Sequence, residues 1–230
     1  MTSPQPYSIV QVGKWGLSIP LRWVSSMWPR AVAGSDSRGG LDGLFFDTRL
    51  RSETPLDGLL ALLVTDLQGF TSMVERLGDA RSQAVMHTHN RVLRRCLQLR
   101  RGVEVAHTGD GVVAAFRSAA AALQCAAEIQ AQFAQHNRSN PETPLHARMG
   151  LHAGEPLPEE GRLFGLCINV AVRACAEAPA GGVLVTHVVS QLAQGRFVFG
   201  AGRDYALKGF SGLTQLYAFE WQSSSGRAAA

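Results

Sequence analysis

Residues 62–71 constrain the fold of this chain more than any other stretch. An apolar run ends there in Asp66, and a glycine, an aromatic residue and a hydroxyl residue follow. This order is typical of a buried β-strand that ends at a sheet edge, where the chain turns into a helix. A carboxylate at the end of a buried strand loses hydration unless it is paired, and a divalent cation is its usual partner. Taken alone, the pattern favours Asp66 as a helix N-cap.

A second acidic residue lies at the tip of a predicted hairpin. Residues 103–107 and 112–116 are short apolar strands, and an Asp-Gly pair beginning at Asp110 lies between them. If this hairpin lies beside the strand that ends at Asp66, both carboxylates meet at one edge of a sheet. Paired carboxylates with open coordination positions suit Mg²⁺ or Mn²⁺ completed by substrate phosphates. A turn aspartate and a helix cap would instead explain each acid separately.

The rest of the patterned chain mixes strands and helices. Further apolar strand patterns cover 59–65, 145–152, 183–186, 197–207 and 213–219. Helical spacing covers 69–77, 79–101, 165–177, 187–194 and a helix that begins after Ser118. This order predicts an α+β fold, a sheet with helices packed on one face. We expect an N-terminal extension over 1–57, a folded domain over 58–221 and a disordered tail over 222–230.

Composition argues against several classes of protein. The 22 basic and 18 acidic residues give a net charge of only +4. A run of arginines over 81–101 lies on a helical pattern, so it predicts a solvated helix face and no nucleic-acid partner. The four cysteines lack CxxC spacing, which favours reduced thiols in a cytoplasmic protein. No run is long and apolar enough to predict a transmembrane helix.

The extension over 1–57 leaves two interpretations open. Between Ile9 and Trp28, apolar residues alternate with Lys14, Arg22 and tryptophans. Such a segment can dock on a membrane surface or on a partner, which would make the protein membrane-associated, or it can pack on its own domain. Pro20 argues against one continuous helix.

Five ordered motifs between Leu59 and Trp221 resemble the catalytic domain of class III nucleotidyl cyclases, the adenylyl and guanylyl cyclases. The motifs are TDLQGFT at 65–71, TGDG at 108–111, RMGLHAGE at 148–155, GLCINVAVR at 165–173 and LKGF at 207–210. The resemblance implies a ferredoxin-like domain with a mostly antiparallel sheet. It also implies a head-to-tail homodimer with active sites at the subunit interface. Each site would convert a nucleoside triphosphate to its 3′,5′-cyclic monophosphate and pyrophosphate with two Mg²⁺ or Mn²⁺ ions.

The resemblance also implies roles for individual residues. Asp66, Leu67 and Asp110 would form the metal site. The residues that would hold the substrate phosphates are Gly69, Phe70, Thr71 and Lys208. Across the interface, Asn169 would orient the ribose and Arg173 would stabilise the transition state. These two residues are four apart, so on a helix they share a face, as a joint role requires.

The base-reading positions depart from the family pattern. Adenylyl cyclases of this type commonly have a lysine at the position of Ala106, and an aspartate or a threonine at that of Arg162. Arg162 offers donors only, which suits guanine O6 and N7, so GTP is slightly favoured over ATP. Glu104 lies two residues before Ala106, so we expect it on the same strand face, where it could accept from guanine. The missing base-reading pair leaves a catalytically silent, nucleotide-binding or regulatory module as the alternative.

Overall fold

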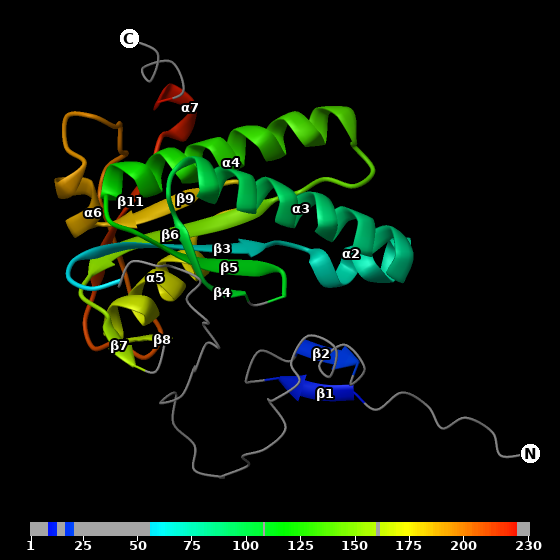
Figure 1. Ribbon diagram of the computed structural model, residues 1–230, viewed down its shortest axis with the longest axis horizontal. Coiled ribbons are helices and arrows are strands. Elements are labelled where there is room, and N and C mark those ends of the chain that lie inside the picture. The colour runs from blue at the N-terminus through cyan, green and yellow to red at the C-terminus, as the bar shows by residue number, and fades with distance from the viewer. Residues whose placement is uncertain (1–8, 13–16, 21–55, 108, 160–161, 225–230) are drawn as a thin grey trace, which may run out of the picture. The chain divides into compact units, whose positions relative to one another are not determined.

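The computed structural model describes residues 9–12, 17–20, 56–107, 109–159 and 162–224 (Figure 1). The chain forms two compact units, residues 1–43 and 44–230. In the first unit, β1 (Ile9–Val12) and β2 (Leu17–Pro20) form an antiparallel pair. Most of the predicted extension and most of the predicted tail lie outside the described residues.

A seven-stranded sheet forms the centre of the second unit (Figure 1). Its order is β10 (Arg203–Tyr205), β11 (Thr214–Ala218), β9 (Val183–Thr186), β6 (Ala147–Gly154), β3 (Leu60–Leu67), β5 (Gly111–Phe116) and β4 (Val103–His107). Only β6 and β9 pair in parallel, and the other neighbours within this sheet are antiparallel. The predicted α+β class with a mostly antiparallel sheet is therefore confirmed.

The apolar run of β3 reflects burial on both faces of the sheet. Ala61 and Leu63 belong to one core cluster, whereas Leu62 and Val64 belong to another on the opposite face. Alternate side chains of a strand point to opposite faces, so a strand covered on both sides needs apolar residues at every position. Asp66 is the first partly exposed residue of this strand, which places its carboxylate at the sheet edge.

Helices supply the cover on both faces (Figure 1). α3 (Asp79–Leu99) and α4 (Ala119–Ser139) pack on the first face, and α2 (Phe70–Leu77), α6 (His187–Leu192) and α7 (Trp221–Ser224) contribute residues to the same cluster. α5 (Leu166–Glu177) packs on the opposite face. The expectation that all helices would cover one face is wrong in this detail, because the apolar residues on the second face of β3 also require a cover.

A small hairpin that the sequence patterns did not predict precedes α5. It consists of β7 (Leu157–Glu159) and β8 (Arg162–Phe164), with Leu157 opposite Phe164. Leu157, Phe164 and the first residue of α5, Leu166, expose 66%, 48% and 68% of their surfaces. Within the described residues, no helix combines the length and the apolar character needed to cross a membrane.

Candidate active site

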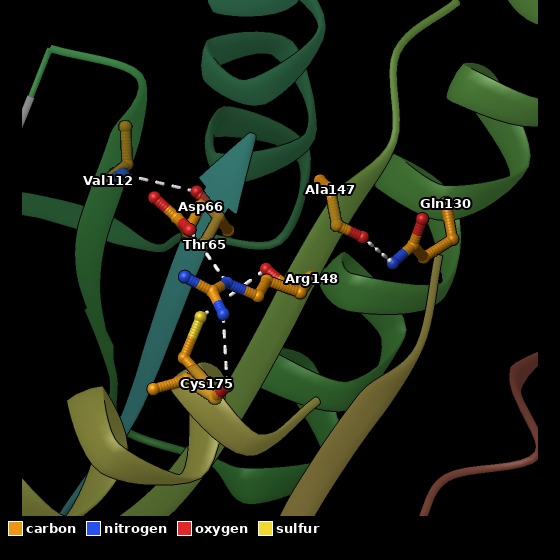
Figure 2. Close-up of polar contacts among 8 residues, drawn as sticks. Thr65, Asp66, Val112, Gln130, Ala147, Arg148 and Cys175 are labelled. Carbon is orange, nitrogen blue, oxygen red and sulfur yellow. Dashed lines mark hydrogen bonds and ion pairs between the residues drawn. The ribbon is translucent and has the colours of Figure 1, made fainter. Parts of the chain in front are cut away.

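Asp66 and Asp110 lie together where β3 ends and the neighbouring antiparallel strand β5 begins. Asp66 pairs with Gly111 in the ladder, so Asp110 lies directly beyond the last pair. The Leu67 main-chain N–H donates to the Asp110 carbonyl over 3.1 Å. One residue before Asp66, the Thr65 hydroxyl accepts from the Val112 N–H over 3.1 Å (Figure 2). These bonds fix the turn that carries Asp110 against the end of β3, so the condition under which the sequence brings the two acids together is met.

Charge and burial make this pair of carboxylates suitable for a divalent cation. Burial, and secondly the nearby Asp66 charge, raise the pKa of the Asp110 carboxyl to about 6. Two acids that repel in this way are relieved by a metal ion, which prefers oxygen ligands. The Leu67 side chain is apolar and has no atom that can bind a metal, so only its main-chain carbonyl could join them. Among the described residues, no group of three or more His, Cys, Asp or Glu lies where it could hold a metal ion.

Arg148 is a site residue to which the sequence reasoning gave no role. It lies opposite Asp66 in the pairing of β3 with β6, and its Nε lies 2.7 Å from Asp66 Oδ2 (Figure 2). Its Nη1 donates to the Ala176 carbonyl in the last turn of α5 over 2.9 Å. The signal in the sequence was an arginine among the residues that alternate with the apolar positions of the 145–152 strand. It could be placed beside Asp66 only with the register of the two strands.

The predicted phosphate-binding residues 69–71 follow shortly after Asp66, where β3 ends. Gly69 has a φ of 72°, in the left-handed region that favours glycine, and α2 begins at the next residue. Thr71 is exposed in the first turn of α2, whereas Phe70 is partly buried against the core. The predicted residue Lys208 lies after β10 and is exposed.

The predicted ribose and transition-state residues both lie on α5. Asn169 is exposed and Arg173 is partly buried, one helical turn further along. An exposed asparagine is consistent with a residue that serves a neighbouring subunit. Whether Asn169 and Arg173 act as the resemblance implies stays a prediction.

The β4 strand corrects the expectation about Glu104. The ladder between β4 and β5 shifts by one residue, so that Glu104 lies opposite Ala114 and Ala106 lies opposite Val113. Ala114 and Val113 face opposite sides of the sheet, so Glu104 and Ala106 do as well. The prediction that they share a face is therefore wrong, because a β-bulge reverses the alternation.

Glu104 is instead engaged on the α3 side of the sheet. Its carboxylate lies 3.6 Å from Arg94 Nε and 3.4 Å from His107 Nδ1, and the His107 contact is the main cause that lowers its pKa. Ala106 is buried on the other face and is apolar, so its side chain cannot hydrogen-bond a base. Arg162 lies on β8, and its side chain is outside the described part of the chain.

A known family model matches most of the second unit. Residues 56–220 match the model of the adenylate and guanylate cyclase catalytic domain. The chain is similar to a Rhizobium meliloti protein provisionally named adenylate cyclase 3, with 34% identity over 139 residues, which cover 60% of this chain and 24% of that protein. It therefore spans about a quarter of the length of this relative.

Solved structures show the same fold. A crystal structure named adenylate/guanylate cyclase/hydrolase from Silicibacter pomeroyi has a TM-score of 0.64 at 27% identity, covering 70% of this chain and 96% of that one. A guanylate cyclase domain from Catenaria anguillulae in complex with GTP has a TM-score of 0.61 at 18% identity, covering 70% and 95%.

Proposed function

Because the chain belongs to the adenylate and guanylate cyclase catalytic domain family, we propose that it is an active nucleotidyl cyclase. It converts a purine nucleoside triphosphate to the 3′,5′-cyclic monophosphate and pyrophosphate. The ribose 3′-oxygen attacks the α-phosphorus, the bond to the bridging oxygen of pyrophosphate breaks, and the hydroxyl proton passes to water. One observation carries this proposal. Asp66 and Asp110 meet where β3 ends and β5 begins, and burial together with the Asp66 charge raises the pKa of Asp110.

The donor set at this edge suits two Mg²⁺ or Mn²⁺ ions. Asp66 and Asp110 supply carboxylate oxygens, Leu67 supplies its carbonyl, and the triphosphate supplies the rest. When bound, the cations would neutralise phosphate charge and lower the pKa of the 3′-hydroxyl. The left-handed turn at Gly69 directs the following main chain past this edge, where Gly69, Phe70 and Thr71 would hold the phosphates together with Lys208.

A head-to-tail homodimer would complete each site with Asn169 and Arg173 from the second subunit. The exposed position of Asn169 supports this arrangement. The apolar side chains of Leu157, Phe164 and Leu166 also support it, because exposed apolar residues near one another are typical of subunit interfaces. A guanidinium over the developing charge is a large electrostatic contribution, and its loss should lower the rate about 10²–10³-fold.

We propose a slight preference for GTP over ATP, which rests on Arg162. Its guanidinium donates only, and guanine O6 and N7 are acceptors. Glu104 does not contribute, because it points to the other face of the sheet. Arg162→Ala should therefore lower kcat/KM for GTP more than for ATP, and an unchanged ratio between the two would contradict the role of Arg162.

The test of the whole proposal is product formation by the purified protein. Mn²⁺ is supplied with ATP, GTP, CTP or UTP, and the products are identified by mass spectrometry. Asp66→Ala should abolish the cyclic product, and Arg173→Ala should lower the rate about 10²–10³-fold, while the dimer persists in sedimentation. A matched control is Arg117→Ala, which removes an exposed arginine that pairs with Asp57 over 3.5 Å.

The alternative is a catalytically silent, nucleotide-binding or regulatory module. The buried, apolar side chain of Ala106, where related enzymes read the base, favours it. No cyclic product from any of the four nucleotides at high protein concentration would refute the enzyme and leave this module.

A further inference from the structure

The Arg148 side chain joins two elements that serve different active sites in the proposed dimer. Its Nε lies 2.7 Å from Asp66 Oδ2, on the strand that carries the metal-binding edge of its own site. Its Nη1 donates over 2.9 Å to the Ala176 carbonyl on α5, the helix that would supply Asn169 and Arg173 to the other site. Figure 2 shows both bonds leaving the same guanidinium. Only 27% of this side chain is exposed, so solvent screens the pair less than it screens a surface ion pair.

The C-terminal end of α5 attracts the Arg148 guanidinium. The last carbonyls of a helix lack partners within the helix, and the partial negative charge at this end attracts cations. α5 has no basic residue in its own last turn. Arg148 therefore supplies, from β6, the cation that this helix end lacks. The same cation offsets the charge of Asp66.

Tight backbone packing makes this contact stiff. A Cβ placed on Gly150 would lie 2.1 Å from the Cys175 nitrogen and 2.5 Å from the Ala171 carbonyl oxygen, so α5 rests directly on the backbone of β6. The Cys175 thiol also donates to the Arg148 carbonyl over 3.4 Å. The end of α5 is thus held to the main chain and to the side chain of one residue. Because α5 and β6 are packed this closely, a shift of Arg148 also shifts the end of α5.

We propose that Arg148 is a positioning residue that couples the metal-binding carboxylate of one active site to the helix that serves the other. This inference rests on the proposed function, because the two sites exist only in the interfacial dimer. Arg148 orients Asp66 for its own site and holds the end of α5 for its neighbour's. By thermodynamic linkage, a ligand that changes the Asp66–Arg148 contact also changes the strength of the hydrogen bond from Arg148 to the Ala176 carbonyl of α5.

Mixed dimers separate the two roles of Arg148. One chain carries Asp110→Ala, which disables its metal site but keeps the Asp66–Arg148 ion pair, and the other carries Arg173→Ala. In the proposed arrangement, one of the two sites of this dimer is intact. It takes both carboxylates from the Arg173→Ala chain and takes α5 from the Asp110→Ala chain. Arg148→Gln is then added to either chain, and the differently tagged dimers are purified.

Each placement has its own expected signature. In the chain that supplies the carboxylates, Arg148→Gln should change the Mn²⁺ concentration for half-maximal rate, because Asp66 loses the cation that lies 2.7 Å from its Oδ2. In the chain that supplies α5, it should lower kcat about tenfold at saturating Mn²⁺, the loss expected for one hydrogen bond to a charged group. Unchanged activity in the second placement would overturn the coupling, because Arg148 would then serve its own site alone. If the mixed dimer of the Asp110→Ala and Arg173→Ala chains, without Arg148→Gln, has no cyclase activity, the interfacial arrangement of the proposed function is refuted instead.

Hydrogen exchange gives a readout that does not depend on catalysis. In metal-free protein, Arg148→Gln should speed amide exchange in the last turns of α5, whereas the control Arg117→Gln should not. Unchanged exchange in α5 would overturn the proposal. If the Gln variant does not fold, Arg148→Lys replaces it. Lysine keeps a charge beside Asp66 but lacks the second arm that reaches Ala176, so kcat should fall with little change in Mn²⁺ dependence. A changed Mn²⁺ dependence with an unchanged kcat would overturn the proposal.

Discussion

Asp110→Asn should stabilise the metal-free protein at pH 8, although it removes a proposed metal ligand. The pKa of Asp110 rises from 3.8 to about 6, so the folded state favours the neutral carboxyl. A shift of about two units corresponds to about 3 kcal/mol of folding free energy once the group is ionised. Because the carboxyl is only partly buried, we expect about 1–2 kcal/mol, or roughly 2–8 °C in Tm.

The sign follows from the direction of the shift. A raised carboxyl pKa contributes stability that is complete below pH 3.8 and is lost as the pH rises through about 6. Asparagine has no proton to lose, so the gain in Tm of the variant should stay nearly constant from pH 8 to about pH 6.5 and should shrink between about pH 6 and about pH 4. In Mn²⁺ the parent protein should have the higher Tm, because the ion stabilises only a protein that binds it.

Thermal unfolding in EDTA and in Mn²⁺, at several values of pH, measures these effects. The matched control is Asp57→Asn, which alters an exposed carboxylate 3.5 Å from Arg117 and should change Tm little at any pH. Asp66→Asn should destabilise the protein, because it leaves the Arg148 guanidinium without its carboxylate partner. An Asp110→Asn variant that is less stable than the parent protein in EDTA at pH 8 would refute the reasoning, as would a difference that does not vary with pH.

Three further outcomes are expected. Gly150→Ala should cost about 2–4 kcal/mol in denaturant unfolding and lower activity, since its Cβ would lie 2.1 Å from the Cys175 nitrogen; Gly200→Ala, with nothing nearer than 3.6 Å, should cost less than about 1 kcal/mol. Burial lowers the pKa of His89 to about 4, so the protein should lose stability as the pH falls from 6.5 towards 4, and His89→Leu should flatten that part of the profile. Cyclase activity at limiting Mn²⁺ should fall below about pH 6, where a proton competes for Asp110, and excess Mn²⁺ should restore it.

Local sequence patterns predicted the elements that carry the carboxylates. The apolar run before Asp66 and the Asp-Gly turn at Asp110 each placed one acid at the end of a strand, whereas their meeting depended on the pairing of β3 with β5. The start of α4 was also local, because the Ser118 hydroxyl accepts from the Ala121 N–H over 3.4 Å as an N-cap. Such signals lie within a few residues of the feature that they predict.

Features that depend on register or on distant pairing were missed. The bulge between Glu104 and Ala106 adds one residue to β4, and a period-two pattern cannot show where such an insertion falls. Arg148 meets Asp66 from 82 residues away, so its contact depends on how β6 aligns with β3. The position of α5 on the second face likewise follows from the whole sheet, and its own sequence does not decide it.

The inner position of β3 has a consequence for synthesis. Its partner on one side, β5, leaves the ribosome well before β6, its partner on the other side. Until β6 is made, one edge of an eight-residue apolar strand has no partner in the sheet. An unpaired apolar edge readily adds strands from other chains. A nascent chain stalled before residue 147 should therefore be prone to aggregation, and residues 60–67 are where a chaperone would protect it.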